Sequence, residues 1–369
     1  MKLGADQLDD LSRGAVFLAT GGGGDPYVSL LATRHILESV GPAEVIAPAD
    51  VADDAYVVTI GAVGAPSISL ELLPSVNDPR IALDAFEQHV GRRVDAVVSF
   101  EIGGGNSLIP LAAAASRGIP VVDGDGMGRA LPEAQMMSYP IAGVAPTPAI
   151  AVDYAGNTAT FSTDTTTTYE RHIRAMAVAM GGMITTVEHP MSGATLKDAV
   201  IPGTLTFAIE LGRLLTRFRG NAQRIIAPLR QLFAASIYGD LFHLYTGKVV
   251  DYQSQMIGGY DVGQATIEAF DSARSPLTLS IRNEYLLATI GDTVAASVPD
   301  LITVLDFETS APINAERLRY GQRVTVLATG CPAFYREPRA LSVVAPRCFG
   351  FDIDYVPVEA LTATHIEHP

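Results

Sequence analysis

Cysteine is scarce in this sequence, which has two such residues, Cys331 and Cys348, among 369. Two cysteines at this separation form neither a disulfide framework nor a zinc motif. The first ten residues lack a basic stretch followed by an apolar segment, so we expect no signal peptide. These absences predict a protein of the reducing cytoplasm.

Long apolar runs and positive charge are also in short supply. No apolar run reaches the roughly 18 residues that a membrane-spanning helix needs, so we expect no membrane association. Lys and Arg number 25 against 40 Asp and Glu, which gives a net charge of −15. Because nucleic-acid binding draws on clustered Lys and Arg, this balance argues against a nucleic-acid partner.

Apolar residues are abundant by contrast. They make up 48% of the chain, while charged residues make up 18%, a composition typical of a folded protein with a sizeable core. The length exceeds what one core usually serves. We predict two domains, residues 1–165 and 166–369, and homo-oligomerisation is the general expectation.

Helical patterns and short apolar runs alternate in the first half. Helices are predicted over residues 8–18, 27–40, 78–90 and 107–116, and buried strands over 44–47, 55–60, 95–100 and 119–122. This succession predicts an α/β domain with a mostly parallel sheet. Ligands of such sheets bind beyond the carboxyl ends of the strands.

The second half has a different character. A hairpin is predicted over residues 149–162, and helices over 169–180 and 204–233, the latter broken near Gly220. From Leu241 onward most segments are strand-like, including 277–282, 301–307, 324–328 and 341–344. These patterns predict a C-terminal α+β domain rich in β-strands.

Four consecutive glycines follow the first predicted helix, and the sequence continues Asp25-Pro26. Glycines admit φ > 0 and can expose successive N–H groups, which bind anions or an oxyanion when a helix follows. The alternative is a sharp reversal in which Asp25 only caps the next helix. The absence of a following Lys-Ser/Thr pair excludes a P-loop. The predicted substrate-binding residues here are Gly21, Gly22, Gly23, Gly24 and Asp25.

A second glycine block follows the predicted strand at 95–100. It reads Glu101-Ile102-Gly103-Gly104-Gly105-Asn106 and opens a helix. A carboxylate and an amide at the end of one strand can face one ligand, because the amide both donates and accepts hydrogen bonds. We expect Glu101 to be catalytic and Gly104, Gly105 and Asn106 to bind substrate, although Asn106 could instead merely cap the helix.

A third block contains Asp123-Gly124-Asp125, Arg129 and Glu133. Two carboxylates on a Gly-rich turn can share a proton, bind a divalent metal, or divide acid and base roles. Arg129 could hold one carboxylate ionised or bind an anionic substrate. We predict that Asp123, Asp125 and Glu133 act with Glu101. The spacing matches no EF-hand or other strong metal motif. A divalent metal stays an open alternative, because these carboxylates could still bind one.

Other polar residues give weaker signals. His189 follows a predicted strand at 183–187, and a packed or exposed histidine is the favoured interpretation. Arg282-Asn283-Glu284 stands at a strand end, where we predict a turn. Cys331 and Cys348 have no histidine nearby in the sequence, which argues against a cysteine nucleophile.

The three blocks, at 21–27, 101–106 and 123–136, occur in the order and spacing of a known family. The chain resembles the S-methyl-thiohydantoin desulfurase-like family, whose genes often neighbour hydantoinase and oxoprolinase genes. The resemblance continues through Asn283-Glu284, Pro299-Asp300-Leu301-Ile302 and Phe349-Gly350-Phe351-Asp352 and so covers nearly the whole chain.

The resemblance implies an enzyme that removes sulfur from a thiohydantoin made in ergothioneine-type catabolism. We therefore expect a hydrolase for a small hydantoin-like ring, in which carboxylates assist the attack of water. One alternative is a hydantoinase- or oxoprolinase-related amidohydrolase subunit, for which a metal would be expected. Another is a non-catalytic ligand-binding subunit of such an enzyme, with a hydantoinase-type partner.

Overall fold

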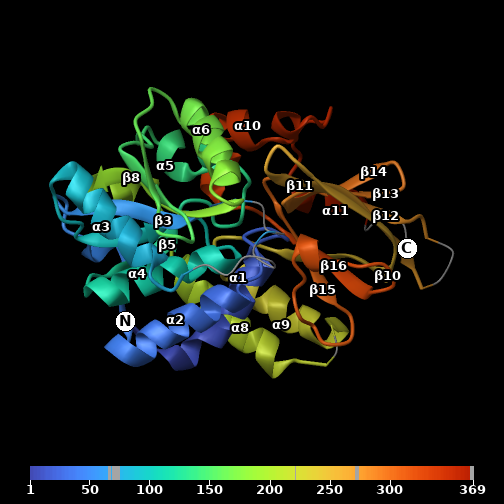
Figure 1. The fold of residues 1–369 in the computed structure, drawn as a ribbon. Helices are drawn as coiled ribbons and strands as arrows, with labels where there is room; N and C mark the ends of the chain where they lie inside the picture. The colour runs from blue at the N-terminus through green and yellow to red at the C-terminus, as the bar shows by residue number, and fades with distance from the viewer. Residues whose placement is uncertain (65–67, 69–74, 221, 271–273, 366–369) are drawn as a thin grey trace.

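The computed structural model describes residues 1–64, 68, 75–220, 222–270 and 274–365. Two sheets organise these residues and stand side by side in Figure 1. The predicted fold class is confirmed: the N-terminal part is α/β with a mostly parallel sheet, and the C-terminal part is rich in antiparallel strands. No described helix is both long and apolar enough to cross a membrane.

The first sheet has a parallel centre with antiparallel edges. Its parallel strands are β2 (Ala43–Ile46), β5 (Val121–Asp125), β4 (Ala96–Ser99) and β3 (Tyr56–Gly64). Its antiparallel strands are β1 (Lys2–Leu3), β8 (Met183–Ser192), β6 (Ala149–Val152), β7 (Thr158–Phe161) and β9 (Ile201–Pro202). Because β8 and β9 follow residue 165, this sheet takes strands from both sides of the predicted domain boundary.

Helices cover both faces of the first sheet. In Figure 1, α2 and α4 lie below its strands, and α5 and α6 lie above them. The helices of this part are α1 (Leu8–Leu18), α2 (Tyr27–Val40), α3 (Asp78–Val90), α4 (Ile109–Arg117), α5 (Ser138–Ile141), α6 (Thr166–Ala179), α7 (Gly193–Ala199), α8 (Thr204–Arg217) and α9 (Ala222–Ala234). Gly14 in α1 and Gly212 in α8 let these two helices pack with their backbones in contact.

The second sheet is antiparallel throughout. Its order is β14-β13-β12-β11-β10-β16-β15. The strands are β10 (Leu241–Ile257), β11 (Tyr260–Ala269), β12 (Leu277–Arg282), β13 (Glu284–Ile290), β14 (Thr293–Ser297), β15 (Leu301–Asp306) and β16 (Arg323–Thr329). Of the two last helices, α11 (Val358–His365) contacts β14 and β16 of this sheet, whereas α10 (Pro338–Val344) packs against α5 of the first part.

Most predicted elements are confirmed, three of them to the residue: the helices at 8–18, 27–40 and 78–90. The predicted break near Gly220 separates α8 from α9. The strand predicted at 341–344 is wrong, because this segment belongs to α10. Pro338 stands in the first turn of that helix, and the buried residues Ala340 and Val344 have helical spacing.

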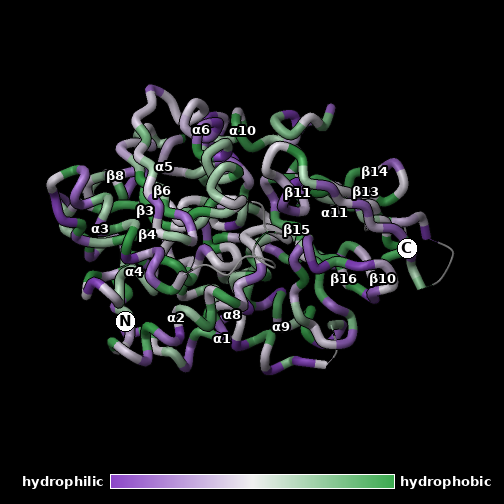
Figure 2. The backbone as a smooth tube through the Cα atoms, viewed as in Figure 1, coloured by the Kyte–Doolittle hydropathy of each residue, from purple (hydrophilic) through white to green (hydrophobic). Residues whose placement is uncertain are grey.

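Hydrophobic residues concentrate along the strands inside each part, while the outer loops are more hydrophilic, as Figure 2 shows. Val57, Val58, Val97 and Val121 of the first sheet are fully buried. Strands buried on both faces between helices carry continuous apolar runs, which explains why β3, β4 and β5 could be recognised in the sequence. Glu101, which follows β4, lines the site described next.

Candidate functional site

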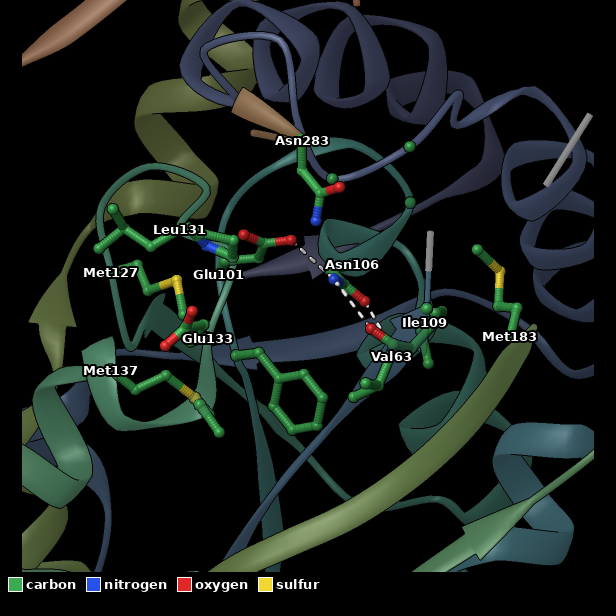
Figure 3. A pocket seen from close by; sticks show the side chains of 18 of the residues that line it. Val63, Glu101, Asn106, Ile109, Met127, Leu131, Glu133, Met137, Met183 and Asn283 are labelled. Carbon is green, nitrogen blue, oxygen red and sulfur yellow. Dashed lines mark hydrogen bonds between the residues drawn. The ribbon is translucent and has the colours of Figure 1, made fainter. Parts of the chain in front are cut away.

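A pocket lies where loops of the first sheet meet the turn between β12 and β13. Its empty space is about 850 Å³, including the part open to solvent. Apolar side chains such as Met127, Leu131 and Met137 form much of its wall, as Figure 3 shows. The carboxyl groups among its described lining residues belong to Asp25, Glu101, Glu133, Glu170, Glu188 and Glu284.

Glu101 and Asn106 form a hydrogen-bonded pair on the floor of this pocket. Asn106 Nδ2 donates to Glu101 Oε1 (2.8 Å), and the backbone N–H of Ala62 donates to Asn106 Oδ1 (2.7 Å). The loop is closed by Ser99, whose hydroxyl donates to the carbonyls of Glu101 (2.6 Å) and Asn106 (2.9 Å). The glycines between the two residues allow this tight loop, so the predicted proximity of carboxylate and amide is observed.

Burial changes the protonation of two pocket acids, Glu101 and Glu284. Burial raises the pKa of Glu101 to about 8, although the hydrogen bond from Asn106 opposes the shift. Burial also raises the pKa of Glu284 well above its usual range, and the nearby charge of Glu101 raises it further. Because burial penalises the charged form of both side chains, both carboxyl groups favour the neutral form at pH 7.

Asn283 and Glu284 reach the pocket from the second sheet. Asn283 has φ of +59°, a left-handed conformation that asparagine tolerates better than most residues. Its backbone N–H donates to the carbonyl of Asp261 (2.7 Å), and its Oδ1 accepts from the N–H of Asp261 (2.9 Å). Figure 3 shows the other end of this amide group facing Glu101 and Asn106.

The first two glycine blocks pack against each other at the pocket edge. The N–H of Gly105 donates to the carbonyl of Gly23 (3.0 Å), and Gly104 has φ of +49° in contact with the same tract. No hydrogen-bond partner for the N–H groups of Gly23 and Gly24 is found among the described residues. Gly23 and Gly24 line the pocket. Gly21, Gly22 and Gly104 do not, and they pack against Tyr285, Glu284 and the Gly23–Gly24 backbone respectively.

Asp123 and Asp125 do not line the pocket. Asp123 accepts hydrogen bonds from the backbone N–H and the hydroxyl of Thr206, near the beginning of α8. Asp125 is fully buried, and its Oδ2 accepts from the N–H groups of Ile102 (2.9 Å), Met127 (2.9 Å) and Gly128 (2.8 Å). Both aspartates therefore shape the loops, and this geometry gives no support to their predicted catalytic role.

Arg129 is also fully buried and is absent from the pocket wall. Its guanidinium group donates to the carbonyls of Ala130, Pro299 and Asp300 and to the hydroxyl of Thr20. These bonds join the third sequence block to the second sheet. The positive charge of Arg129 opposes the rise in the pKa of Glu284, so its effect on the site acts at a distance and not through contact with a ligand.

The remaining predicted acids, Asp25 and Glu133, line the pocket but are held by arginines. Arg317 donates to Asp25 Oδ2, and Arg282 is paired with Glu133 Oε1. Asp25 also accepts from the N–H of Tyr27 (2.9 Å), which fits the alternative interpretation of a cap. Within the described residues, no three His, Cys, Asp or Glu side chains are grouped to hold a metal ion, so the donor set suggested by the sequence does not fit one.

Three residues of the pocket were not predicted as site residues: Glu188, Asn283 and Glu284. The predicted turn at Asn283-Glu284 is present, but it directs both side chains into the pocket. An asparagine followed by an acid between two alternating strands was the available signal. The cysteines stay outside the site: Cys348 is exposed, and burial raises the pKa of the Cys331 thiol to about 12, which opposes a nucleophilic role.

Comparisons with known proteins agree with the resemblance of the sequence. The family model described as S-Me-THD-like, N-terminal domain, matches residues 6–163, and that described as S-Me-THD-like, C-terminal domain, matches residues 163–358. An X-ray crystal structure of a protein from Chromobacterium violaceum superimposes with a TM-score of 0.81 at 26% sequence identity, covering 97% of this chain and 100% of that one. A search of curated proteins gave no match. The chain belongs to the S-Me-THD-like family.

Proposed function

We propose that this protein is a hydrolase that acts on a small hydantoin-like ring and removes sulfur from an S-methyl-thiohydantoin or thiohydantoin. The observation that carries this proposal is the presence in one pocket of two buried acids, Glu101 and Glu284, that form no ion pair with an Arg or Lys of the described residues. Perturbed carboxyl groups in a cleft are typical of acid–base catalysis.

The polar groups of the pocket suit the edge of such a ring. A hydantoin-type ring presents N–H donors beside carbonyl acceptors. The neutral carboxyl group of Glu101 can donate one hydrogen bond and accept another, and Asn283 Nδ2 can donate to a ring oxygen. Asn106 holds Glu101 in place, because its amide already bonds Glu101 and Ala62. The N–H groups of Gly23 and Gly24, which have no partner among the described residues, can bind a ring oxygen, while the methionine and leucine wall contacts the apolar faces.

The proposed reaction needs an acid at the ring and a base for water. With an S-methyl-thiohydantoin, water adds to the ring carbon that bears sulfur as Glu101 protonates the adjacent ring nitrogen. The carbon–sulfur bond then breaks, the carbonyl forms, and the products are hydantoin and methanethiol. Because Glu101 is neutral at pH 7, it suits the role of the acid.

The first experiment is incubation with S-methyl-thiohydantoin, thiohydantoin, hydantoin and 5-oxoproline, with thiol release and ring opening followed separately. We expect thiol release from the sulfur-bearing rings with the ring left intact. Ring opening would indicate an amidohydrolase instead. Binding of these compounds without any reaction would indicate a ligand-binding subunit, although a binding role alone gives no reason for acids without Arg or Lys partners.

A further inference from the structure

The proposed reaction requires a base, and the acids of the pocket can be sorted by their partners. Glu101 and Glu284 favour the neutral form. Three other acids that line the pocket are ion-paired with arginine: Asp25 with Arg317, Glu133 with Arg282, and Glu170 with Arg174. Glu188 lines the same pocket and has no Arg or Lys partner in the described structure.

Glu188 is held by two hydroxyl groups and lies beside an imidazole. Its Oε2 accepts hydrogen bonds from the hydroxyl of Tyr169 and from Thr186 Oγ1 (3.2 Å). Its Oε1 lies 3.2 Å from Nδ1 of His189. The side chain is 1% exposed, so these groups and the pocket are its surroundings. A carboxyl group fixed at one oxygen by two donors is set in position for chemistry at the pocket.

The contact between Glu188 and His189 depends on an irregular backbone. Successive residues of a strand point to opposite faces, so neighbouring side chains do not normally meet. Here β8 has a bulge against β3: Thr59 pairs with Glu188 and Val57 with Met191, so two residues of β8 lie opposite one of β3. His189 lies in this bulge with φ of +49°, which turns its imidazole toward the carboxyl group of Glu188.

A left-handed conformation is costly for a residue that carries a Cβ, and it persists where the surroundings impose it. His189 is fully buried, and neither of its ring nitrogens has a hydrogen-bond partner among the described residues, although Nδ1 lies 3.2 Å from Glu188 Oε1. The titratable groups around it are Glu188, Tyr139 on α5 and Tyr169 on α6, with the two tyrosine rings 6.3 and 6.4 Å from the imidazole. Packing alone does not explain why a buried histidine adopts this left-handed conformation.

We propose that Glu188 is the base that activates water and that His189 is a positioning residue that holds its carboxyl group. This inference rests on the proposed function. Glu188 takes one proton from the attacking water as Glu101 protonates the ring nitrogen. When the carbon–sulfur bond breaks, the hydroxyl proton of the intermediate returns to Glu101, and Glu188 gives its proton to the leaving sulfur. Both acids thus regain their starting states.

The test compares Glu188→Gln with Glu308→Gln, an exposed acid outside the pocket that is paired with Arg323. Since general base catalysis contributes about 10²–10⁴ in rate, we expect Glu188→Gln to lower kcat by at least about 10²-fold. The Kd for hydantoin should change by less than about threefold, because the substitution preserves size and polarity. Glu308→Gln should leave kcat unchanged.

The role of His189 is tested by His189→Asn, since asparagine tolerates the left-handed conformation. We expect kcat to fall about tenfold with the melting temperature and the Kd for hydantoin preserved. A lower melting temperature with unchanged kcat would mean that His189 is only structural. A parent-like kcat in Glu188→Gln would overturn the proposed base while leaving the proposed function intact. Inactivity of the parent protein on every sulfur-bearing ring would overturn both.

Discussion

The protonation of Glu101 links one residue to the pH dependence of the reaction. Burial raises its pKa to about 8, so the acid form predominates below that pH and is lost above it. We predict that kcat/KM falls as pH rises through about 8, because the ring nitrogen then lacks its proton donor.

Glu101→Gln tests this assignment, because glutamine can still accept the hydrogen bond from Asn106. At pH 7 we expect turnover to fall by about 10²-fold, and the decline near pH 8 should disappear from the residual activity. Glu308→Gln changes an exposed acid paired with Arg323 and is the control. A variant at Glu101 that keeps the parent profile would show that another group is the acid.

Gly22 shows how a residue without a side chain can set the position of a pocket carboxyl group. A Cβ at this position would lie 2.7 Å from both Cγ and Cδ of Glu284, well inside van der Waals contact. We predict that Gly22→Ala destabilises the protein by about 1–3 kcal/mol and weakens hydantoin binding, because Glu284 must move. Urea denaturation and calorimetric titration measure the two effects.

A double-mutant cycle separates this contact from a general effect on the glycine tract. In a Glu284→Ala background the clash is absent. Gly22→Ala should therefore lower the free energy of unfolding clearly less in this background than in the parent protein. An equal loss of unfolding free energy in both backgrounds would mean that the strain arises in the backbone and not from contact with Glu284.

At the level of elements, the turn between β12 and β13 brings the second sheet to the site. Its geometry depends on the left-handed conformation of Asn283, which glycine adopts freely. We predict that Asn283→Gly keeps the fold but weakens hydantoin binding by about tenfold, because one hydrogen bond to the ring is lost. Calorimetric titration gives the affinity, and thermal denaturation gives the stability.

Asn283→Asp is the matched comparison. Aspartate keeps the acceptor for the N–H of Asp261 and also tolerates the turn, but it cannot donate to the ring. If the donor matters, both variants should lose affinity. If only Asn283→Gly loses affinity, the amide acts through the turn and not through the ligand.

The elements also show what could be predicted from the sequence. The glycine-rich loops after α1 and β4 could be recognised in the sequence. Four consecutive glycines follow α1, and three glycines lie between an acid and an amide after β4, patterns that indicate a functional loop. The direction of the side chains in Asp123-Gly124-Asp125 was not, since it depends on which backbone N–H groups Asp125 meets after folding. Glu188 was hidden for a related reason: the bulge that pairs it with His189 exists only through pairing with β3.

For the whole molecule, the site joins segments that are far apart in the chain. Gly23 and Glu101 come from loops of the first sheet, Glu188 from its antiparallel strand β8, and Glu284 from the second sheet. Composition and periodicity predicted the two sheets well, because each sheet buries its own apolar face. The meeting of the two sheets is set by buried polar contacts such as those of Arg129, which sequence patterns do not specify.

Several buried acids make the stability of the whole protein depend on pH. Burial raises the pKa of Glu316 to about 8 and that of Asp125 to about 7, in addition to that of Glu101. Below about pH 4 these groups are protonated in both the folded and the unfolded chain. Between that pH and the raised values only the unfolded chain releases the protons, so a rise in pH favours unfolding.

We therefore predict that the free energy of unfolding falls from about pH 5 to pH 8, with each such group contributing about 1 kcal/mol per pH unit. Glu316→Gln should reduce this slope, because Glu316 is buried, lies outside the pocket wall, and has no hydrogen-bond partner for either carboxyl oxygen among the described residues. The exposed control Glu308→Gln should leave the slope unchanged. Urea denaturation at intervals of half a pH unit measures it, and a free energy that rises toward pH 8 would mean that these carboxyl groups are ionised in the folded protein.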